Sequence, residues 1–232
     1  MQAMQSGVEF ILRNGGPVAA VLILLSIVAL TMTIYKFWQF AINRVGRHAR
    51  ALAAVEMWFG GQRQEGYEAV AGDRSPLARV VAHAMRGRTH GGGSLDAVKE
   101  DVTRVALEQL HELRRYLRGI EVIAQTAPLL GLLGTVVGMI EAFSQLQASG
   151  AAVNPADLAG GIWTALLSTA LGLAVAIVFS TLGAWFESRV ENERSIIETT
   201  LTGFFAQRIT EDQLREFDEV TSFPTKGGAH AY

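Results

Sequence analysis

The hydrophobic positions of this chain are concentrated in three long runs. Charged residues are absent from residues 17–35, 122–140 and 158–186. A helix rises about 1.5 Å per residue, so about 20 residues cross a hydrocarbon core of about 30 Å, whereas runs of about 10 to 14 are typical of buried helices in soluble proteins. The pattern therefore predicts three transmembrane helices, at 17–40, 120–146 and 158–186.

Outside these runs, apolar positions recur at the three- and four-residue spacing of amphipathic helices. Ser75-Pro76 and Ser94 are typical helix starts, because a serine side chain caps the first free amides and proline fits the first turn. From Leu95 an apolar stripe runs into the second transmembrane helix without a break, and another continues past the third. We therefore predict an all-α integral membrane protein with long helical extensions.

The composition agrees with a membrane protein. Of the 232 residues, 50% are hydrophobic and 18% are charged, against roughly 25% charged in soluble domains. The 22 acidic residues nearly balance the 20 basic ones, so no excess of positive charge indicates nucleic acid as a partner. Because the chain has no cysteine, it can form no disulfide, no thiolate metal site and no cysteine nucleophile.

The basic residues predict the orientation in the membrane. Only Arg13 precedes the first transmembrane helix, and no Lys or Arg lies between the second and third. Because Lys and Arg favour the cytoplasmic side, we expect the N-terminus outside and the C-terminus in the cytoplasm. The first helix is longer than a signal-peptide core, so we expect it to remain in the mature protein. The predicted segments are an external amphipathic segment at 1–16, transmembrane helices at 17–40, 120–146 and 158–186, a cytoplasmic helical domain at 41–119, an external loop at 147–157, a cytoplasmic helical extension at 187–220 and a flexible tail at 221–232.

Small residues are concentrated in the second and third transmembrane helices. Small side chains let two helix backbones approach closely, so that van der Waals packing and interhelical hydrogen bonds hold the helices together in lipid. The first helix is instead rich in Leu, Ile and Val, which is typical of a peripheral, lipid-facing position. The predicted packing residues are Gly131, Gly134 and Gly138 in the second helix, and Gly161 and Gly172 in the third.

Hydroxyl side chains lie at a common depth in these two helices. Thr135 is 15 residues from position 120 and Thr169 is 15 residues from position 184, about 22 Å from the cytoplasmic ends by helical rise. They could therefore form one polar layer, with Ser168 slightly further out and Thr164 more than one turn further out. The alternative is that each hydroxyl bonds a carbonyl of its own helix.

Pro128 disturbs the backbone ladder of the second helix, because it cannot donate to the carbonyl of Ala124. This favours either a simple packing kink or a hinge. A freed carbonyl at this depth could also bind water near the cytoplasmic mouth. The sequence leaves these readings open.

The sequence contains none of several common catalytic motifs. The chain has no phosphate-binding loop, no HExxH pattern and no nucleophile elbow, and the glycines of GLLGTVVG lie inside an apolar run. Histidines at positions 48, 83, 90 and 111 lack the spacing of metal ligands. We therefore predict no catalytic residue, no metal site and no cofactor.

Two segments resemble the ExbB/TolQ/MotA family of proton-driven motor subunits, and most closely its three-span ExbB and TolQ members. They are APLLGLLGTVVGM at 127–139 and GGIWTALLSTALGLAVAI at 160–177. The short outer loop and the single large insertion between the first two spans are also similar. By position, Thr135 and Thr169 match the family's pore-lining threonines, and Pro128 matches the proline before its GLxGT segment.

The resemblance implies an architecture and partners. Family members form a homo-oligomeric ring, a pentamer, in the bacterial inner membrane, around two transmembrane helices from a dimer of an ExbD- or TolR-like single-span subunit. An aspartate of that subunit carries the proton. The proton motive force then energises an outer-membrane transport or envelope process, with a TonB- or TolA-like protein as a further partner.

The chain departs from the family at two positions. Many ExbB and TolQ sequences carry a glutamate where this chain has Thr164, and a proline where it has Val178. No ionisable side chain is therefore left in the middle of any transmembrane helix, although a buried acid is the usual basis of a proton relay. Glu121 and Glu141, at the two ends of the second helix, either gather protons or are ordinary interfacial charges.

Two functions remain open at this point. The favoured one is a motor subunit that couples inward proton flow to movement of a partner helix. The alternative is a passive membrane scaffold, or an autonomous channel, whose small-residue helices assemble without a motor partner. A neighbouring reading frame for a short protein with one N-terminal span, an aspartate within it and a periplasmic domain would favour the motor.

Overall fold

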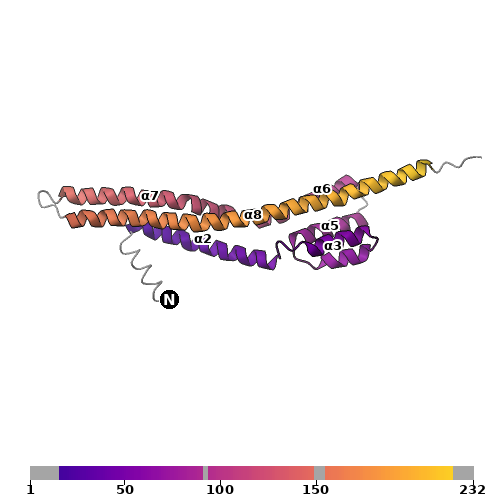
Figure 1. Ribbon diagram of the computed structural model, residues 1–232, viewed down its shortest axis with the longest axis horizontal. Coiled ribbons are helices and arrows are strands. Elements are labelled where there is room, and N and C mark those ends of the chain that lie inside the picture. Colours follow the sequence, from indigo (N-terminus) through magenta and orange to yellow (C-terminus); the bar gives the residue numbers. More distant parts are fainter. Residues whose placement is uncertain (1–15, 91–93, 149–154, 222–232) are drawn as a thin grey trace, which may run out of the picture. The chain divides into compact units, whose positions relative to one another are not determined.

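The computed structural model describes residues 16–90, 94–148 and 155–221 (Figure 1). Every regular element in these ranges is a helix, and no strand occurs among them, which confirms the predicted all-α class. The predicted N-terminal segment, outer loop and tail lie largely outside the described residues. The helices are α2 (Gly16–Ile42), α3 (Ala49–Phe59), α4 (Arg63–Ala71), α5 (Pro76–His90), α6 (Leu95–Arg114), α7 (Leu117–Ala148) and α8 (Pro155–Thr221).

The chain divides into two compact units. Among the described residues, the membrane unit comprises residues 16–42, 111–148 and 155–190, and the second unit comprises residues 43–90, 94–110 and 191–221. Helices α6 and α8 each contribute residues to both units.

Three helical stretches are long and apolar enough to cross a membrane. The first is Pro17–Ile42, and the other two lie within Leu95–Gln147 and Leu158–Ala206. The structure therefore places a long apolar helix at each of the three predicted transmembrane segments. We refer to α2 as span one, to α7 as span two, and to the part of α8 up to residue 190 as span three.

The three spans pack together in the membrane unit. Ala29 of span one, Ile120 of span two and Phe179 of span three belong to one buried hydrophobic cluster. On other faces of span one, Leu24 and Trp38 are exposed. Span one therefore contributes one buried face to the unit and leaves the rest for lipid or other partners.

The structure corrects the prediction of an unbroken helix from Leu95 into span two. The helix is interrupted at Arg115 and Tyr116, where Tyr116 adopts a left-handed backbone conformation with φ of 69°. Such a conformation is uncommon for a residue other than glycine. The apolar periodicity did not reveal the break because a turn of two residues leaves the hydrophobic positions on both sides intact. We call the interruption between α6 and α7 the joint.

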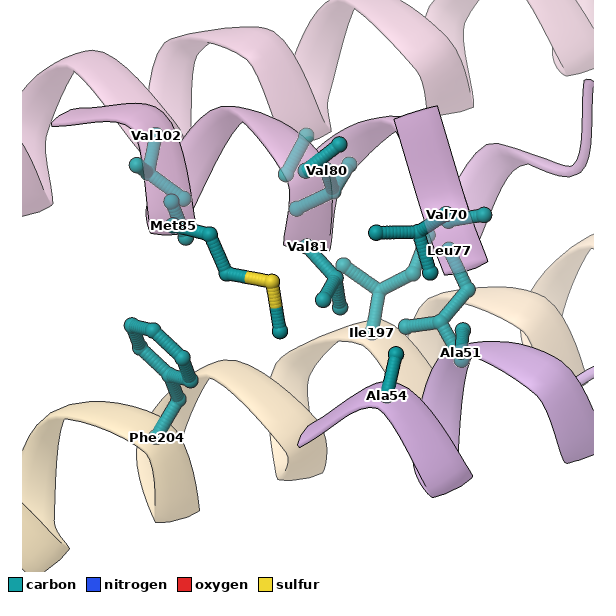
Figure 2. Packing of buried hydrophobic residues seen from close by; sticks show 14 of the residues in the cluster. Ala51, Ala54, Val70, Leu77, Val80, Val81, Met85, Val102, Ile197 and Phe204 are labelled. Atoms are coloured by element: carbon teal, nitrogen blue, oxygen red, sulfur yellow. The ribbon is translucent and has the colours of Figure 1, made fainter. Parts of the chain in front are cut away.

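The second unit packs around a hydrophobic core (Figure 2). Leu77, Val80, Val81 and Met85 of α5 are almost completely buried in it. Residues from the other helices complete the core, among them Ala51 and Ala54 of α3, Val70 of α4, Val102 of α6, and Ile197 and Phe204 of α8.

Serine side chains cap two helices of this unit as predicted. The Oγ of Ser75 accepts a hydrogen bond from the amide of Ala78, and the Oγ of Ser94 accepts one from the amide of Ala97, both at 3.3 Å. These bonds satisfy amides that would otherwise be free in the first turns of α5 and α6.

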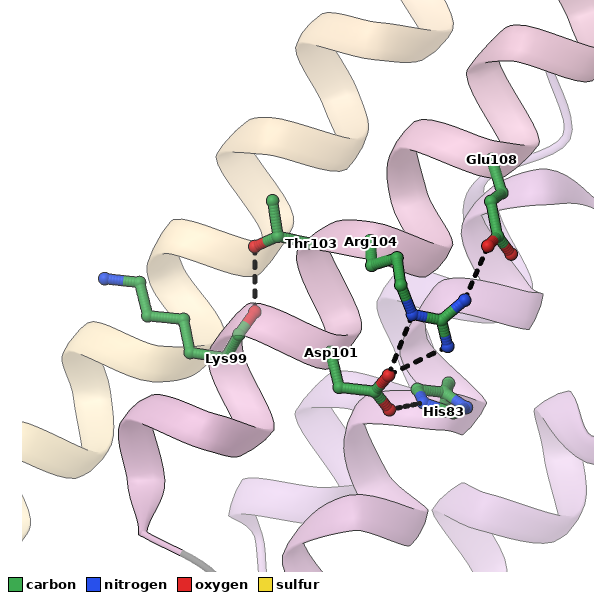
Figure 3. A network of polar contacts seen from close by, with 6 residues as sticks. All are labelled: His83, Lys99, Asp101, Thr103, Arg104 and Glu108. Atoms are coloured by element: carbon green, nitrogen blue, oxygen red, sulfur yellow. Dashed lines mark hydrogen bonds and ion pairs between the residues drawn. The ribbon is translucent and has the colours of Figure 1, made fainter.

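A polar network lies on the exposed surfaces of α5 and α6 (Figure 3). The Nε2 atom of His83 is 2.6 Å from one carboxylate oxygen of Asp101, and Arg104 donates to the other at 2.8 Å. Arg104 also pairs with Glu108. The hydrogen bond with His83 and then that from Arg104 hold the pKa of Asp101 below its usual value.

Glu193 of α8 is a buried carboxylate in the second unit, with 1% of its surface exposed. Its Oε2 accepts a hydrogen bond from the amide of Gly46 at 3.1 Å and lies 2.8 Å from Nε2 of His48, while its Oε1 has no partner among the described residues. Gly46 has φ of 88°, a conformation that suits glycine. The carboxylate therefore ties the segment after span one to α8.

Candidate functional site: the contact between spans two and three

Glycines bring the backbones of spans two and three into direct contact. A Cβ atom on Gly172 would lie 2.5 Å from the carbonyl oxygen of Ala127, and one on Gly134 would overlap the hydroxyl oxygen of Ser168. Real Cβ atoms do not approach other atoms this closely, so a larger residue at either position must push the helices apart. The geometry is that of small-residue packing between membrane helices.

The other predicted packing glycines lie at the same contact. A Cβ atom on Gly161 would be 2.6 Å from the Cβ of Ala142, and one on Gly138 would be 3.0 Å from the Cβ of Ala165. One on Gly131 would be 3.0 Å from the backbone of span three. The structure thus brings all five predicted glycines to one surface between the two spans.

The carbonyl of Gly131 lies within hydrogen-bond distance of two hydroxyl groups of span three. Thr169 donates a hydrogen bond from Oγ1 to this carbonyl at 2.9 Å. The Oγ of Ser168 is 3.3 Å from the same carbonyl but only 2.7 Å from that of Ala165. Since a hydroxyl has a single proton, Ser168 bonds mainly within its own helix, and Thr169 makes the stronger bond between the spans.

Thr135 and Thr164 bond within their own helices. Thr135 donates to the carbonyl of Leu132 at 2.7 Å, and Thr164 donates to that of Gly160 at 3.1 Å. Thr135 and Thr169 therefore donate to different carbonyls. The depths of Thr135 and Thr169 differ by about one helical turn, because Thr169 bonds Gly131, which is four residues before Thr135.

Thr135 also lines an open groove along span two. The groove runs from this threonine toward the C-terminal end of the helix, and its walls are mainly apolar. A hydroxyl at one end of an apolar groove can orient a polar group on a helix that lies against it. The lining residues are Thr135, Val136, Met139, Ile140, Phe143, Ser144 and Gln147.

Pro128, Glu121 and Glu141 also lie on span two. Pro128 is inside α7, which continues through it as a helix. Glu121 and Glu141 are exposed, and Glu121 accepts a hydrogen bond from Gln125 at 3.1 Å. The hinge role of Pro128 and the proton-gathering roles of Glu121 and Glu141 therefore stay predictions.

Sequence reasoning missed one residue of the membrane unit that the structure singles out. Lys36, near the end of span one, is completely buried. Its position directly after an apolar run is typical of an ordinary interfacial charge, so the sequence held no signal of burial. Among the described residues, no three His, Asp or Glu side chains gather as metal ligands.

Together, these features define a polytopic membrane protein whose second and third spans pack backbone against backbone, with hydroxyl groups at the contact. The chain belongs to the MotA/TolQ/ExbB proton channel family. The family's model matches residues 73–199, more than half of the chain. The match includes α6 and span two, and it begins after span one.

Several curated relatives carry ExbB names. A protein of Methanothermobacter thermautotrophicus named as an ExbB homolog is 28% identical over 203 residues, which cover 85% of this chain and 71% of the relative. The biopolymer transport protein exbB1 of Vibrio cholerae is 40% identical over 82 residues, or 35% of this chain and 36% of the relative. An ExbB-like 1 protein of Synechocystis is 33% identical over 180 residues, or 71% of this chain and 64% of the relative. The chain therefore spans from about a third to about seven-tenths of these relatives.

Proposed function

We propose that this protein is the ring-forming subunit of a proton-driven motor in the bacterial inner membrane. In this proposal, a homopentamer surrounds a dimer of an ExbD/TolR-like single-span subunit and uses the proton motive force to energise an outer-membrane transport or envelope process. A TonB- or TolA-like protein is a further partner. Membership of the proton channel family and the biopolymer transport names of the relatives support this proposal. We assign the protein no enzymatic activity.

The single observation that carries the proposal is the hydroxyl contact between the spans. Thr169 bonds Gly131 across the contact, and Thr135 lies one turn away beside an open groove. Neutral hydroxyls can donate to a carboxylate and accept from a carboxylic acid. A partner's acid that lies near them would therefore keep a hydrogen bond in both protonation states.

The absence of an acid at position 164 of span three supports a role for the partner's aspartate as the only titrating group. Thr164, where many relatives carry a glutamate, bonds its own helix. If the partner's aspartate does all the titrating, Thr164→Glu should be tolerated when this site is hydrated. The same substitution should disrupt the complex when the site is dry, because a buried unpaired carboxylate is costly in a membrane.

The proposed orientation places the N-terminus in the periplasm and the C-terminus in the cytoplasm. It rests on the distribution of Lys and Arg, which favour the cytoplasmic side. The second unit would then be cytoplasmic. In the proposed ring, exposed apolar side chains on spans two and three, such as Leu132 and Leu166, face lipid or neighbouring copies.

The decisive experiment is a mass measurement on the purified complex. Native mass spectrometry in detergent should give five copies of this chain, and co-expression with an ExbD/TolR-like single-span protein should add two copies of that protein. A monomer in both preparations would contradict the proposal.

The alternative is an autonomous channel or passive scaffold without a motor partner. The hydroxyls of Thr135, Thr164 and Thr169 all donate to backbone carbonyls of this chain. These hydroxyls therefore have hydrogen-bond partners without an acid from another subunit. Purified protein in liposomes separates the two functions. Proton leakage from liposomes that contain this chain alone favours the channel, and leakage only with the partner favours the motor.

A further inference from the structure

The joint between α6 and α7 leaves backbone carbonyls without partners in their own helix. The last carbonyls of a helix have no amide ahead of them to accept from. At this joint the amide of Arg115 bonds the carbonyl of His111 at 3.0 Å. The carbonyls of Glu112 and Leu113 are then the next to need donors, and the Leu113 residue is itself 1% exposed.

Span one supplies those donors. The Nζ of Lys36 donates to the carbonyl of Leu113 at 2.6 Å and to Oε1 of Gln39 at 2.8 Å. Gln39 in turn donates to the carbonyl of Glu112 at 3.4 Å. The lysine and glutamine together therefore cap the end of α6 from another helix.

The capping residues belong to a continuous face of span one. Met32, Tyr35, Lys36 and Gln39 follow the spacing of residues that share one side of a helix. A Cβ atom on Gly119, just after the joint, would lie 3.2 Å from the sulfur of Met32, so span one passes very close to the start of span two.

The aromatic contact on this face reaches the joint itself. The ring of Tyr35 packs edge to face on that of Tyr116, with centroids 5.5 Å apart. Tyr116 is the residue in the left-handed conformation. Such a conformation has a cost and persists where surrounding contacts fix it.

The partial negative charge at the C-terminal end of α6 favours a cation beside the Leu113 carbonyl. The C-terminal end of a helix carries a partial negative charge, so an ammonium group is stabilised beside it. Burial of an ammonium group is costly unless it is hydrogen-bonded, and the two bonds of Lys36 supply that compensation. An apolar residue of the same length would leave the Leu113 carbonyl without this donor.

We infer that Lys36 is a positioning residue, and that span one acts through it as a clamp on the joint between α6 and span two. Span one lies outside the part of the chain that matches the family, and the chain passes from the second unit into span two through this joint. The clamp is independent of the proposed function, because it depends only on contacts within the membrane unit.

Limited digestion with trypsin tests the clamp, since Arg114, Arg115 and Arg118 are exposed around the joint. The full-length protein is purified in detergent as wild type and as Lys36→Met, which keeps the length of the side chain but removes the charge and the donors. Cleavage of a folded protein follows the population of locally opened states. Loss of a hydrogen bond from a charged group should raise cleavage at these arginines at least about tenfold.

Two further variants make the result specific. Lys99→Met removes an exposed lysine of α6 far from the joint in sequence and should leave cleavage unchanged. Gln39→Leu removes the second, neutral donor and should raise cleavage at the joint by about two- to tenfold. It also serves as the test if Lys36→Met cannot be purified.

The pattern of cuts decides the outcome. Faster cleavage confined to the joint, with cuts after Arg79 and Arg104 at the wild-type rate, supports the clamp. Unchanged cleavage at the joint overturns it, whether in Lys36→Met or in Gln39→Leu as its replacement. Equal acceleration at all sites also overturns it, because that result indicates general destabilisation. None of these results depends on whether the protein drives a motor.

Discussion

Replacing Thr169 by valine separates the packing role of its hydroxyl from a role in coupling. Valine keeps the shape of threonine but cannot donate the 2.9 Å hydrogen bond to the Gly131 carbonyl. That carbonyl keeps the amide donor of its own helix, and the Ser168 hydroxyl lies 3.3 Å away. The carbonyl is therefore not left without partners.

The expected loss of stability is small for this reason. Hydrogen bonds between membrane helices contribute about 0.6 kcal/mol on average and at most about 1.7 kcal/mol. We expect Thr169→Val to lower the free energy of unfolding by about 1 kcal/mol, which shifts the unfolding equilibrium roughly fivefold. Complex mass should stay unchanged, while force-dependent function should be abolished.

Thr135→Val is the matched variant. Its hydroxyl bonds Leu132 in the same helix, so no bond between spans is lost. The free energy of unfolding should therefore change by less than about 0.5 kcal/mol, yet function should again be abolished. Thr164→Val should have a milder effect on function, because that residue lies further out.

Three measurements on the same variants check this reasoning. Titration of the purified protein with a denaturing detergent gives the change in unfolding free energy, native mass spectrometry gives the assembly, and complementation of a deletion strain gives proton-driven uptake or envelope integrity. Full activity of both Thr135→Val and Thr169→Val would refute the polar layer. Equal loss of stability in the two variants would refute the distinct hydrogen bonds described here.

Three further predictions address packing, topology and pH. Gly134→Leu and Gly172→Leu should each break assembly, because a side chain at either glycine meets atoms of the facing span; wild-type mass for both variants would contradict this. A cysteine at Ser149 should be labelled from outside intact cells, and one at Ser94 only after lysis; the reverse pattern would overturn the orientation. Because the pKa of Asp101 is lowered in the folded protein, its contribution to stability is complete above its usual pKa of 3.8 and is lost as pH falls through the lower, folded value. Asp101→Asn should therefore weaken the loss of thermal stability in acid, and identical pH profiles would show that the network contributes nothing.

The helices and the glycine contact could be predicted because both depend on local patterns. Uncharged runs of sufficient length predict spans whatever surrounds them. Small residues on each turn predict close packing, and Gly131, Gly134 and Gly172 do lie against the facing helix. The serine caps follow from two or three neighbouring residues and needed no tertiary information.

The joint and its clamp could not be predicted, because they depend on contacts between distant parts of the chain. The left-handed conformation of Tyr116 belongs to a residue type that rarely adopts it, and no glycine or proline marks the position. The burial of Lys36 depends on a carbonyl 77 residues away. In the same way, the depth of Thr169 was available from counting, but its acceptor on the other helix was not.

The core of the second unit has a consequence for biosynthesis. Its α3, α4 and α5 helices are made early, whereas Glu193, Ile197 and Phe204, which contact them or their preceding segment, come from the last helix of the chain. Contacts between such distant segments form late and slow folding. Until a ribosome has synthesised α8, the apolar surfaces of the early helices have no partner from that helix, and exposed surfaces of this kind favour aggregation. Completion of this unit therefore requires synthesis of the third span and the part of α8 beyond it.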